Sequence, residues 1–212
     1  MQRRLIPTRS GSPAIRAARL RLVAGGRTLV SDLSFECVPG RVTALVGPNG
    51  SGKSSLLRLL LGLDTGGLDT TGEGSVEFRG PSAPRFGHYD PEMRLPTSAT
   101  VAAWDRAFAR TRPRVCTLRS GGIVPSTPLA GLSTGEEKRM LLEEILNREN
   151  DFIFLDEPFA NLSDDGWSAL GRGLRGICER RVVVLSTNRR DVLGAVGLSV
   201  STIELGGWRK VS

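Results

Sequence analysis

A glycine-rich stretch, GPNGSGKSS at residues 47–55, has the composition and spacing of a phosphate-binding loop. It fits the pattern GxxxxGK[ST] in full, and its glycines let backbone N–H groups turn inward around an anion. Lys53 is placed to reach the terminal phosphates of a nucleotide, and Ser54 to bind the accompanying Mg²⁺. The candidate binding residues of this loop are Gly47, Pro48, Asn49, Gly50, Ser51, Gly52, Lys53, Ser54 and Ser55.

A second candidate site is FIFLDE at 152–157, an apolar run that ends in two carboxylates. Asp156 is suited to bind Mg²⁺ beside Ser54, and Glu157 to orient or deprotonate an attacking water. A strand that ends in two acids is weak evidence alone, but this one follows a complete phosphate loop by about a hundred residues. Together the two motifs predict that the chain binds a nucleoside triphosphate and that it carries a carboxylate able to cleave it.

A third motif, LSTGE at 132–136, lies between the other two. With it the chain resembles the ABC-type ATPases, the nucleotide-binding subunits of ABC transporters, whose signature is LSGGQ at a helix start. Ser133 and Gly135 match this signature, whereas Thr134 and Glu136 depart from it. The resemblance implies that Ser133 and Gly135 contact the γ-phosphate of ATP held by the other subunit of a head-to-tail dimer. A helix N-terminus suits that anion, but Glu136 adds a negative charge beside it.

Two residues that the family uses around the γ-phosphate are replaced. The switch strand VVVLSTNRRD carries Asn188 where the family has His, and the stretch RFGHYDPEM at 85–93 has no Gln, although the family places one there to contact Mg²⁺. The only histidine, His88, lies in that stretch and not at the switch. Asn donates a neutral hydrogen bond, which is roughly half as strong as a charge-assisted one. We therefore assign Glu157 and Asn188 to catalysis and expect hydrolysis to be slow or to depend on a partner.

The order of expected elements predicts an α/β fold of the P-loop NTPase type in one domain, residues 1–212. Strands that alternate with helices indicate a mostly parallel sheet, preceded by antiparallel N-terminal strands. The phosphate-loop core is expected over 14–79 and 132–205, with a reduced helical subdomain inserted at the proline-rich residues 80–131. Strands are expected at 14–23, 32–38, 41–46, 74–80, 151–158, 181–186 and 199–205, and helices at 53–63, 98–111, 133–149, 164–179 and 189–197.

Composition limits the partners and the compartment. The net charge is +7 and the pI is about 10.3, which favours an anionic partner or reflects a general bias to arginine, since only three of the 29 basic residues are Lys. Cys37, Cys116 and Cys178 are far apart, so neither a disulfide framework nor a zinc site is expected. No apolar run is long enough to cross a bilayer. The first 31 residues carry seven Arg and no acid, which is typical of an organellar targeting segment or of an irregular N-terminus before the first strand.

Among ABC ATPases, the short chain, GH at 87–88, DEPF at 156–159 and the missing adenine-stacking aromatic near Val23 or Ala24 resemble the haem-exporter ATPases of cytochrome c maturation (the CcmA type). That resemblance implies ATP and Mg²⁺ as ligands, a membrane-spanning permease partner and a homodimer or paired ABC subunit. It places the chain on the inner face of a bacterial cytoplasmic membrane, or of the mitochondrial inner membrane if the N-terminus is a targeting segment. Two alternatives stay open: a scaffold that binds ATP without cleaving it, and a soluble switch acting on nucleic acid. The second is disfavoured because no basic surface interleaved with aromatics is visible.

Overall fold

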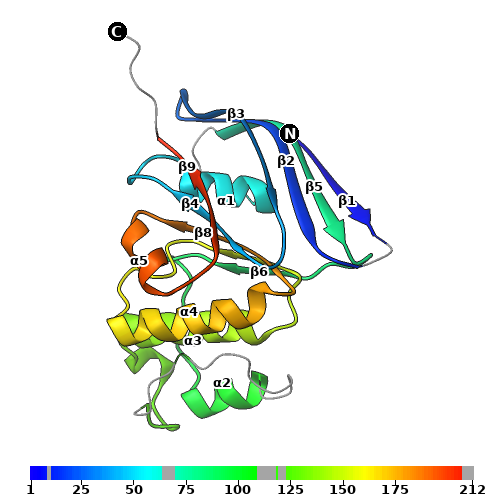
Figure 1. Cartoon of the computed structure of the whole chain (residues 1–212). Helices are drawn as coiled ribbons and strands as arrows, with labels where there is room; N and C mark the ends of the chain where they lie inside the picture. Colours follow the sequence, from blue (N-terminus) through cyan, green and yellow to red (C-terminus); the bar gives the residue numbers. More distant parts are fainter. Residues whose placement is uncertain (9–10, 64–69, 109–117, 119–122, 207–212) are drawn as a thin grey trace.

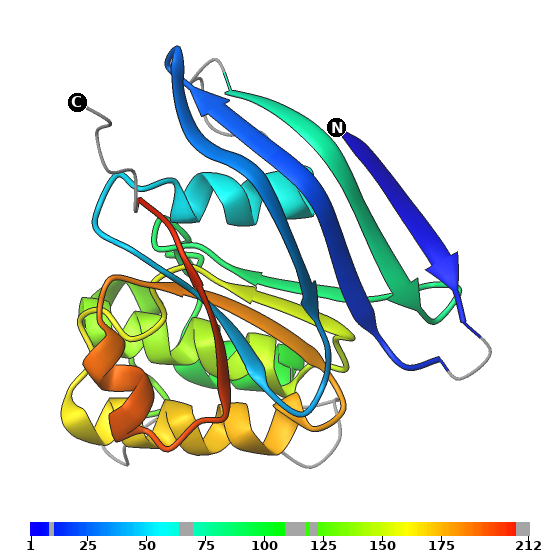
Figure 2. The ribbon, with the colours of Figure 1, turned by 45° about the horizontal axis from the view of Figure 1, so that its top comes forward.

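A four-stranded sheet and a five-stranded parallel sheet enclose one helix, and other helices cover the outer face of the parallel sheet (Figure 1; Figure 2). The computed structural model describes residues 1–8, 11–63, 70–108, 118 and 123–206. Cys116 and the end of the expected helix 98–111 lie outside this part of the chain. Within it, no helix has the length and apolar character that crossing a bilayer requires.

The second sheet has five strands in the order β6-β7-β8-β4-β9, and all its neighbours run parallel. The strands are β4 (Val42–Val46), β6 (Phe86–Tyr89), β7 (Phe152–Leu155), β8 (Val182–Thr187) and β9 (Val200–Glu204). Every residue of β4, β7 and β8 is buried, which explains why these strands are continuous apolar runs in the sequence. The predicted α/β fold with a parallel sheet is confirmed.

The first sheet has four strands in the order β1-β5-β2-β3: β1 (Gln2–Pro7), β2 (Ala14–Ala24), β3 (Arg27–Cys37) and β5 (Thr70–Gly80). Strand β2 pairs antiparallel with β3 and with β5, as expected, whereas β1 pairs parallel with β5. The expectation of an irregular N-terminus was therefore wrong. The register sets Arg4, Glu77, Arg16 and Glu36 opposite one another across the four strands, so charges of opposite sign alternate and favour this pairing.

Helix α1 (Lys53–Leu61) lies between the two sheets, and α3 (Thr134–Asn147), α4 (Asp164–Cys178) and α5 (Arg190–Ala195) lie on the other side of the parallel sheet (Figure 2). Leu56, Leu57 and Leu60 of α1 are fully buried in a core shared with both sheets. Apolar residues of α3, α4 and α5 form a second core with the parallel strands. The phosphate loop is thus fixed between two packed layers.

The stretch 80–131 contains more regular structure than expected. It holds β6, an edge strand of the parallel sheet, which was not predicted because prolines surround it. It also holds α2 (Val101–Phe108), which starts later than predicted, and the 3₁₀ turn Leu129–Gly131. Leu95, Val101 and Leu129 pack with Met140 of α3 in a small separate core. The division of the chain into core and insert stays a prediction.

Candidate nucleotide-binding site

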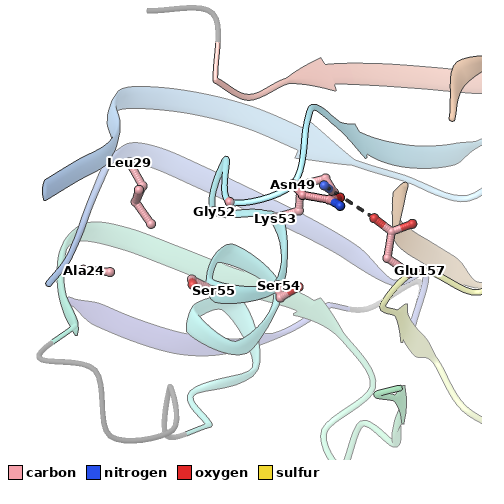
Figure 3. A pocket seen from close by; sticks show the side chains of 9 residues that line it. Ala24, Leu29, Asn49, Gly52, Lys53, Ser54, Ser55 and Glu157 are labelled. Atoms are coloured by element: carbon pink, nitrogen blue, oxygen red, sulfur yellow. Dashed lines mark ion pairs between the residues drawn. The ribbon is translucent and has the colours of Figure 1, made fainter. Parts of the chain in front are cut away.

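A cavity of about 470 Å³ opens at the start of α1, at the edge where the parallel strands end. Figure 3 shows the side chains around it, which come from the β2–β3 hairpin, the phosphate loop and the end of β7. Its lining residues are Ala24, Leu29, Asn49, Gly50, Gly52, Lys53, Ser54, Ser55 and Glu157. The structure therefore brings most of the predicted loop together with the predicted catalytic carboxylate.

The loop presents backbone donors to this cavity. Gly52 is the N-cap of α1 with φ 95°, a left-handed conformation that favours glycine, and no side chain caps the helix. The first N–H groups of α1 are thus left without a side-chain acceptor, and a helix start of this kind binds anions. Ser51 Oγ is buried without a hydrogen-bond partner in the same loop.

Lys53 is 5% exposed, and its ammonium group is held by oxygen atoms only. Nζ donates to the carbonyl oxygens of Gly47 at 2.9 Å and Pro48 at 3.1 Å, and lies 3.4 Å from Glu157 Oε1. Gly47 lies against β9, since an added Cβ would come within 2.4 Å of the Leu205 carbonyl oxygen. Gly47, Pro48 and Ser51 do not line the cavity, and the carbonyl oxygens of Gly47 and Pro48 hold Lys53 instead.

Asp156 lies behind Glu157, is 4% exposed, and accepts a short hydrogen bond from the Ser186 hydroxyl. Ser186 Oγ in turn accepts the Glu157 N–H at 2.9 Å, so one hydroxyl joins both carboxylate-bearing residues. Ser186 is not among the site residues predicted from the sequence. The available signal was a hydroxyl residue that directly continues the apolar strand at 182–185, because a buried polar side chain needs a partner.

Glu157 has φ 45°, an unusual backbone conformation for a residue with a side chain, which costs about 1–3 kcal/mol. Its Oε2 accepts the Asn188 N–H at 3.4 Å, and the Asn188 side chain donates to Asn49 Oδ1 at 3.2 Å. Asn188 is thus brought to the cavity rim, between the phosphate loop and the carboxylate. Strain at a residue with this setting is common at functional sites.

The donors around the cavity suit a Mg²⁺-nucleotide. Ser54 lines the cavity, and Asp156 is buried directly before Glu157. Their oxygen atoms would suit Mg²⁺, which in phosphate sites needs only one or two protein groups beside substrate oxygens and water. Among the described residues there is no cluster of three or more His, Cys, Asp or Glu that would form a metal site without a substrate. Ala24 and Leu29 give the hairpin side of the cavity an aliphatic surface, with Ala24 near the position where the family carries its stacking aromatic.

Ser133 and Gly135 do not line this cavity. Ser133 is the N-cap of α3 and forms a capping box with Glu136: Glu136 Oε2 accepts the Ser133 N–H at 2.8 Å and its hydroxyl at 2.6 Å. These bonds lower the pKa of Glu136. The glutamate that departs from the family signature therefore stabilises the start of its own helix.

The stretch 85–93, where the family carries its Mg²⁺-contacting Gln, contains Asp90, which directly follows β6. Asp90 accepts a hydrogen bond from Arg58 of α1 at 2.7 Å, and the pKa of Asp90 is lowered, since the bonds to Arg58 and the Glu92 N–H outweigh desolvation. The Leu95 N–H donates to Glu137 of α3 at 2.7 Å. The loop after β6 is thus tied to both α1 and α3.

Lys138 of α3 is a further residue that the sequence analysis missed. It is 6% exposed, and Nζ donates to the carbonyl oxygens of Glu157 at 2.8 Å and Ala160 at 2.7 Å. A signal for Lys138 was present in the sequence, because it is one of only three lysines among 29 basic residues. Burial lowers the pKa of Lys138 from 10.5 to about 8, while the carboxylates of Glu157 and Asp156 oppose the shift.

The fold and site define a P-loop nucleotide-binding domain, and comparison with known proteins gives its family. The family described as "ABC transporter" matches residues 30–160, which is more than half of the chain. The chain is 34% identical over 198 residues to the zinc import ATP-binding protein ZnuC of Halorhodospira halophila, covering 86% of this chain and 71% of that protein. It is 31% identical over 200 residues to the cytochrome c biogenesis ATP-binding export protein CcmA of Nitrobacter hamburgensis, covering 89% and 96%.

Among solved structures, a putative ABC transporter ATP-binding protein from Pyrococcus furiosus matches with a TM-score of 0.72 at 18% identity, covering 91% of this chain and 97% of that one. The chain belongs to the ABC transporter family and is an ATP-binding subunit of that family. Such subunits hydrolyse ATP with Mg²⁺, act as dimers and pair with membrane permeases. The relatives give no support to the mitochondrial placement.

The lowered pKa of Lys138 predicts a pH-dependent stability. Below about pH 8 the folded and unfolded chains both hold this proton, whereas above it only the unfolded chain does, up to about 10.5. The unfolded state then binds more protons, so the free energy of unfolding rises with pH by at most about 1.4 kcal/mol per unit.

We expect wild type to gain stability relative to Lys138→Met between about pH 8 and about pH 9.5, as measured by urea unfolding without nucleotide. Tyr89, whose ring lies 5.3 Å from Nζ, and Glu137 beside it are present in both chains and cancel. Lys138→Arg keeps its charge and serves as control, showing no such gain over Lys138→Met. Parallel curves for wild type and Lys138→Met would contradict the assignment.

Proposed function

We propose that this chain binds Mg²⁺-ATP in the cavity at the start of α1 and hydrolyses it slowly to drive a membrane-spanning permease. The observation that carries the proposal is the ion pair of 3.4 Å between Lys53 and Glu157. It joins the phosphate loop to the carboxylate at the end of β7, so the group that binds phosphate and the group that activates water share one cavity.

The roles of the residues follow from their contacts. Lys53 exchanges its carbonyl partners for the β- and γ-phosphates, together with the N–H groups at the start of α1. Ser54 and Asp156 would hold Mg²⁺, which would supply positive charge beside the phosphates. Release of Lys53 frees the Glu157 carboxylate to accept a proton from the attacking water.

Asn188 explains why we expect turnover to be slow. Its amide lies at the cavity rim and donates a hydrogen bond that Asn49 accepts, so it is placed to donate to a γ-phosphate instead. A neutral amide stabilises the extra charge of the transition state less than an imidazolium does. The alternative, a scaffold that binds ATP without cleaving it, applies if this loss of transition-state stabilisation is large enough to prevent turnover.

A second subunit completes the site in this proposal. Ser133 and Gly135 lie at an exposed helix start away from the cavity of their own chain, so they reach a γ-phosphate only across an interface. A head-to-tail homodimer, or a pair with another ABC subunit, supplies that contact. The exposed side of the loop after β6 is proposed to receive the permease, because Arg58 and Glu137 tie this loop to α1 and α3.

The transported substrate is proposed from sequence motifs and from the relatives. The CcmA relative acts as an export protein of cytochrome c biogenesis and the ZnuC relative in zinc import, by their names. GH at 87–88 and DEPF at 156–159, which resemble the CcmA type, favour haem export or cytochrome c maturation, although the identity to ZnuC is 34% against 31% to CcmA. The bacterial cytoplasmic membrane is then the location, and a soluble switch acting on nucleic acid is the less favoured alternative.

ATP binding should depend on Lys53. Lys53→Ala removes the cation from the phosphates, and we expect it to abolish the thermal stabilisation by Mg²⁺-ATP, which at a hundredfold excess over Kd is about 2.7 kcal/mol. Thermal unfolding with and without ATP measures this, with exposed Arg172→Ala as the matched control. Equal ATP-induced shifts in wild type and Lys53→Ala would show that the nucleotide binds elsewhere.

Hydrolysis should depend on Glu157 and be limited by Asn188. Glu157→Gln removes the base and spares the Mg²⁺ ligands, so it should abolish phosphate release and retain ATP. Asn188→His restores a donor that can be charged and should raise kcat by about tenfold, since charge-assisted bonds are stronger by 1 kcal/mol or more. Steady-state phosphate release from the three chains tests this. An unchanged rate in Glu157→Gln would exclude Glu157 as the catalytic carboxylate, and no turnover in any variant or with a partner would favour the scaffold.

Attachment to the membrane should occur through a partner. Carbonate washing of membranes is expected to release the chain, and affinity capture from detergent-solubilised membranes to recover a polytopic protein with it. Arg94, which is exposed on the loop after β6, offers the matched test: Arg94→Glu should weaken recovery of that protein and leave ATP binding intact. Recovery of nucleic acid or ribosomes instead would support the soluble switch.

A further inference from the structure

The turn at residues 157–160 is held by side chains from two helices. Lys138 of α3 donates to the carbonyl oxygens of Glu157 and Ala160, the first and last residues of the turn. Trp167 of α4 donates its indole N–H to the carbonyl oxygen of Phe159 at 2.9 Å. With Ser186 bonded to the Glu157 N–H, the backbone of Glu157 is restrained on both sides.

These restraints matter because Glu157 is strained. Its φ of 45° is unfavourable for any residue with a Cβ, and persists only where the surroundings impose it. The direction of the carboxylate depends on this backbone conformation, since the side chain leaves the main chain at the strained residue. Loosening either end of the turn would let Glu157 relax and move its carboxylate away from Lys53.

The residue type at 138 fits this role. Of the 29 basic residues only three are lysines, and both lysines in the described part of the chain contact Glu157. An ammonium is a compact group with three donors, so it can serve two carbonyls inside a tight turn. A guanidinium is planar and larger, so it fits a tight turn less well. Burying the charged ammonium of Lys138 costs free energy, and an uncharged residue at a purely structural position would avoid this cost.

These contacts also extend from Trp167 towards the switch residue Asn188. The guanidinium of Arg189 lies 4.5 Å from the centre of the Trp167 ring, and Arg189 directly follows Asn188. The turn therefore lies between α3, whose N-cap is Ser133, and the segment that carries the switch residue. Lys138 is the connection to α3.

We propose that Lys138 is a positioning residue for Glu157: it holds the turn 157–160 against α3 and thereby sets the direction of the catalytic carboxylate. This rests on the proposed function as an ATPase. A displacement of α3 would then pass to Glu157 through two hydrogen bonds, so that occupation of the start of α3 by a second subunit promotes hydrolysis.

Trp167 can report on the turn by its fluorescence, because its indole bonds to Phe159. Trp104→Phe and Trp208→Phe leave Trp167 as the only tryptophan and keep both side chains, Lys138 and Trp167, that bond to the turn. In this chain, Lys138→Met removes the ammonium with little change in length, Lys138→Arg retains the charge, and exposed Arg172→Met is the control. Trp167 emission, Mg²⁺-ATP Kd, kcat and thermal stability are measured for each.

We expect Lys138→Met to shift Trp167 emission and to lower kcat by about tenfold or more, because displacement of a catalytic group by about 1 Å can cost a hundredfold. Its Kd for Mg²⁺-ATP should stay within about twofold, with Lys138→Arg intermediate and Arg172→Met unchanged. A loss in kcat without a loss in binding is the pattern of a group that acts only in the transition state.

Unchanged Trp167 emission and kcat in Lys138→Met would overturn the proposal. A parallel loss of kcat, affinity for Mg²⁺-ATP and stability would also overturn it, because it indicates a merely structural role. If the parent chain binds ATP but does not turn it over, the proposed function fails separately. Lys138 is then judged by the ATP-induced change in Trp167 emission: its loss in Lys138→Met supports the positioning role, and its persistence refutes it.

Discussion

The parallel arrangement of β4, β7 and β8 is the constraint on which the site depends. Parallel neighbours end at the same edge, so the phosphate loop after β4, the carboxylates after β7 and the switch residue after β8 meet there although they are far apart in sequence. Helix α1 then directs its start to that edge, because it packs between the two sheets. Catalytic groups on rigid strand ends need few further contacts to reach working positions.

Four charged groups at this edge are buried, and each is paired with oxygen or nitrogen atoms. Lys53 and Lys138 are held by backbone carbonyls, Asp156 by a hydroxyl, and Asp90 by Arg58. An unpaired buried charge would cost several kcal/mol, so these pairings restrict each side chain to one position. The same pairings connect α1, α3 and the ends of the strands, which are the parts that a nucleotide, a second subunit and a permease would contact.

Prediction from sequence succeeded where a short motif determines its own geometry, and failed where partners are remote. GxxxxGK[ST] places its helix start and its lysine by local turns, so the start of α1 at Lys53 was predicted correctly, and Gly52, Lys53 and Ser54 line one cavity. Strand β1 was missed because its residues QRRLIP carry no alternation and become a strand only by pairing with β5. Strand β6 was missed for a similar reason: prolines surround it, and its partner β7 lies more than sixty residues later.

The sequence by itself determined the nucleotide chemistry of this protein: the loop, the two carboxylates, the LSTGE helix start and the replacement of histidine by Asn188. Residue types and short spacings carry these, since each depends on neighbours within a few positions. Only the tertiary structure decided how Glu157 is held, through Ser186 from β8, Lys138 from α3 and Lys53 from α1. Those contacts join segments whose separation along the chain contains no information about distance in space, so packing alone brings them together.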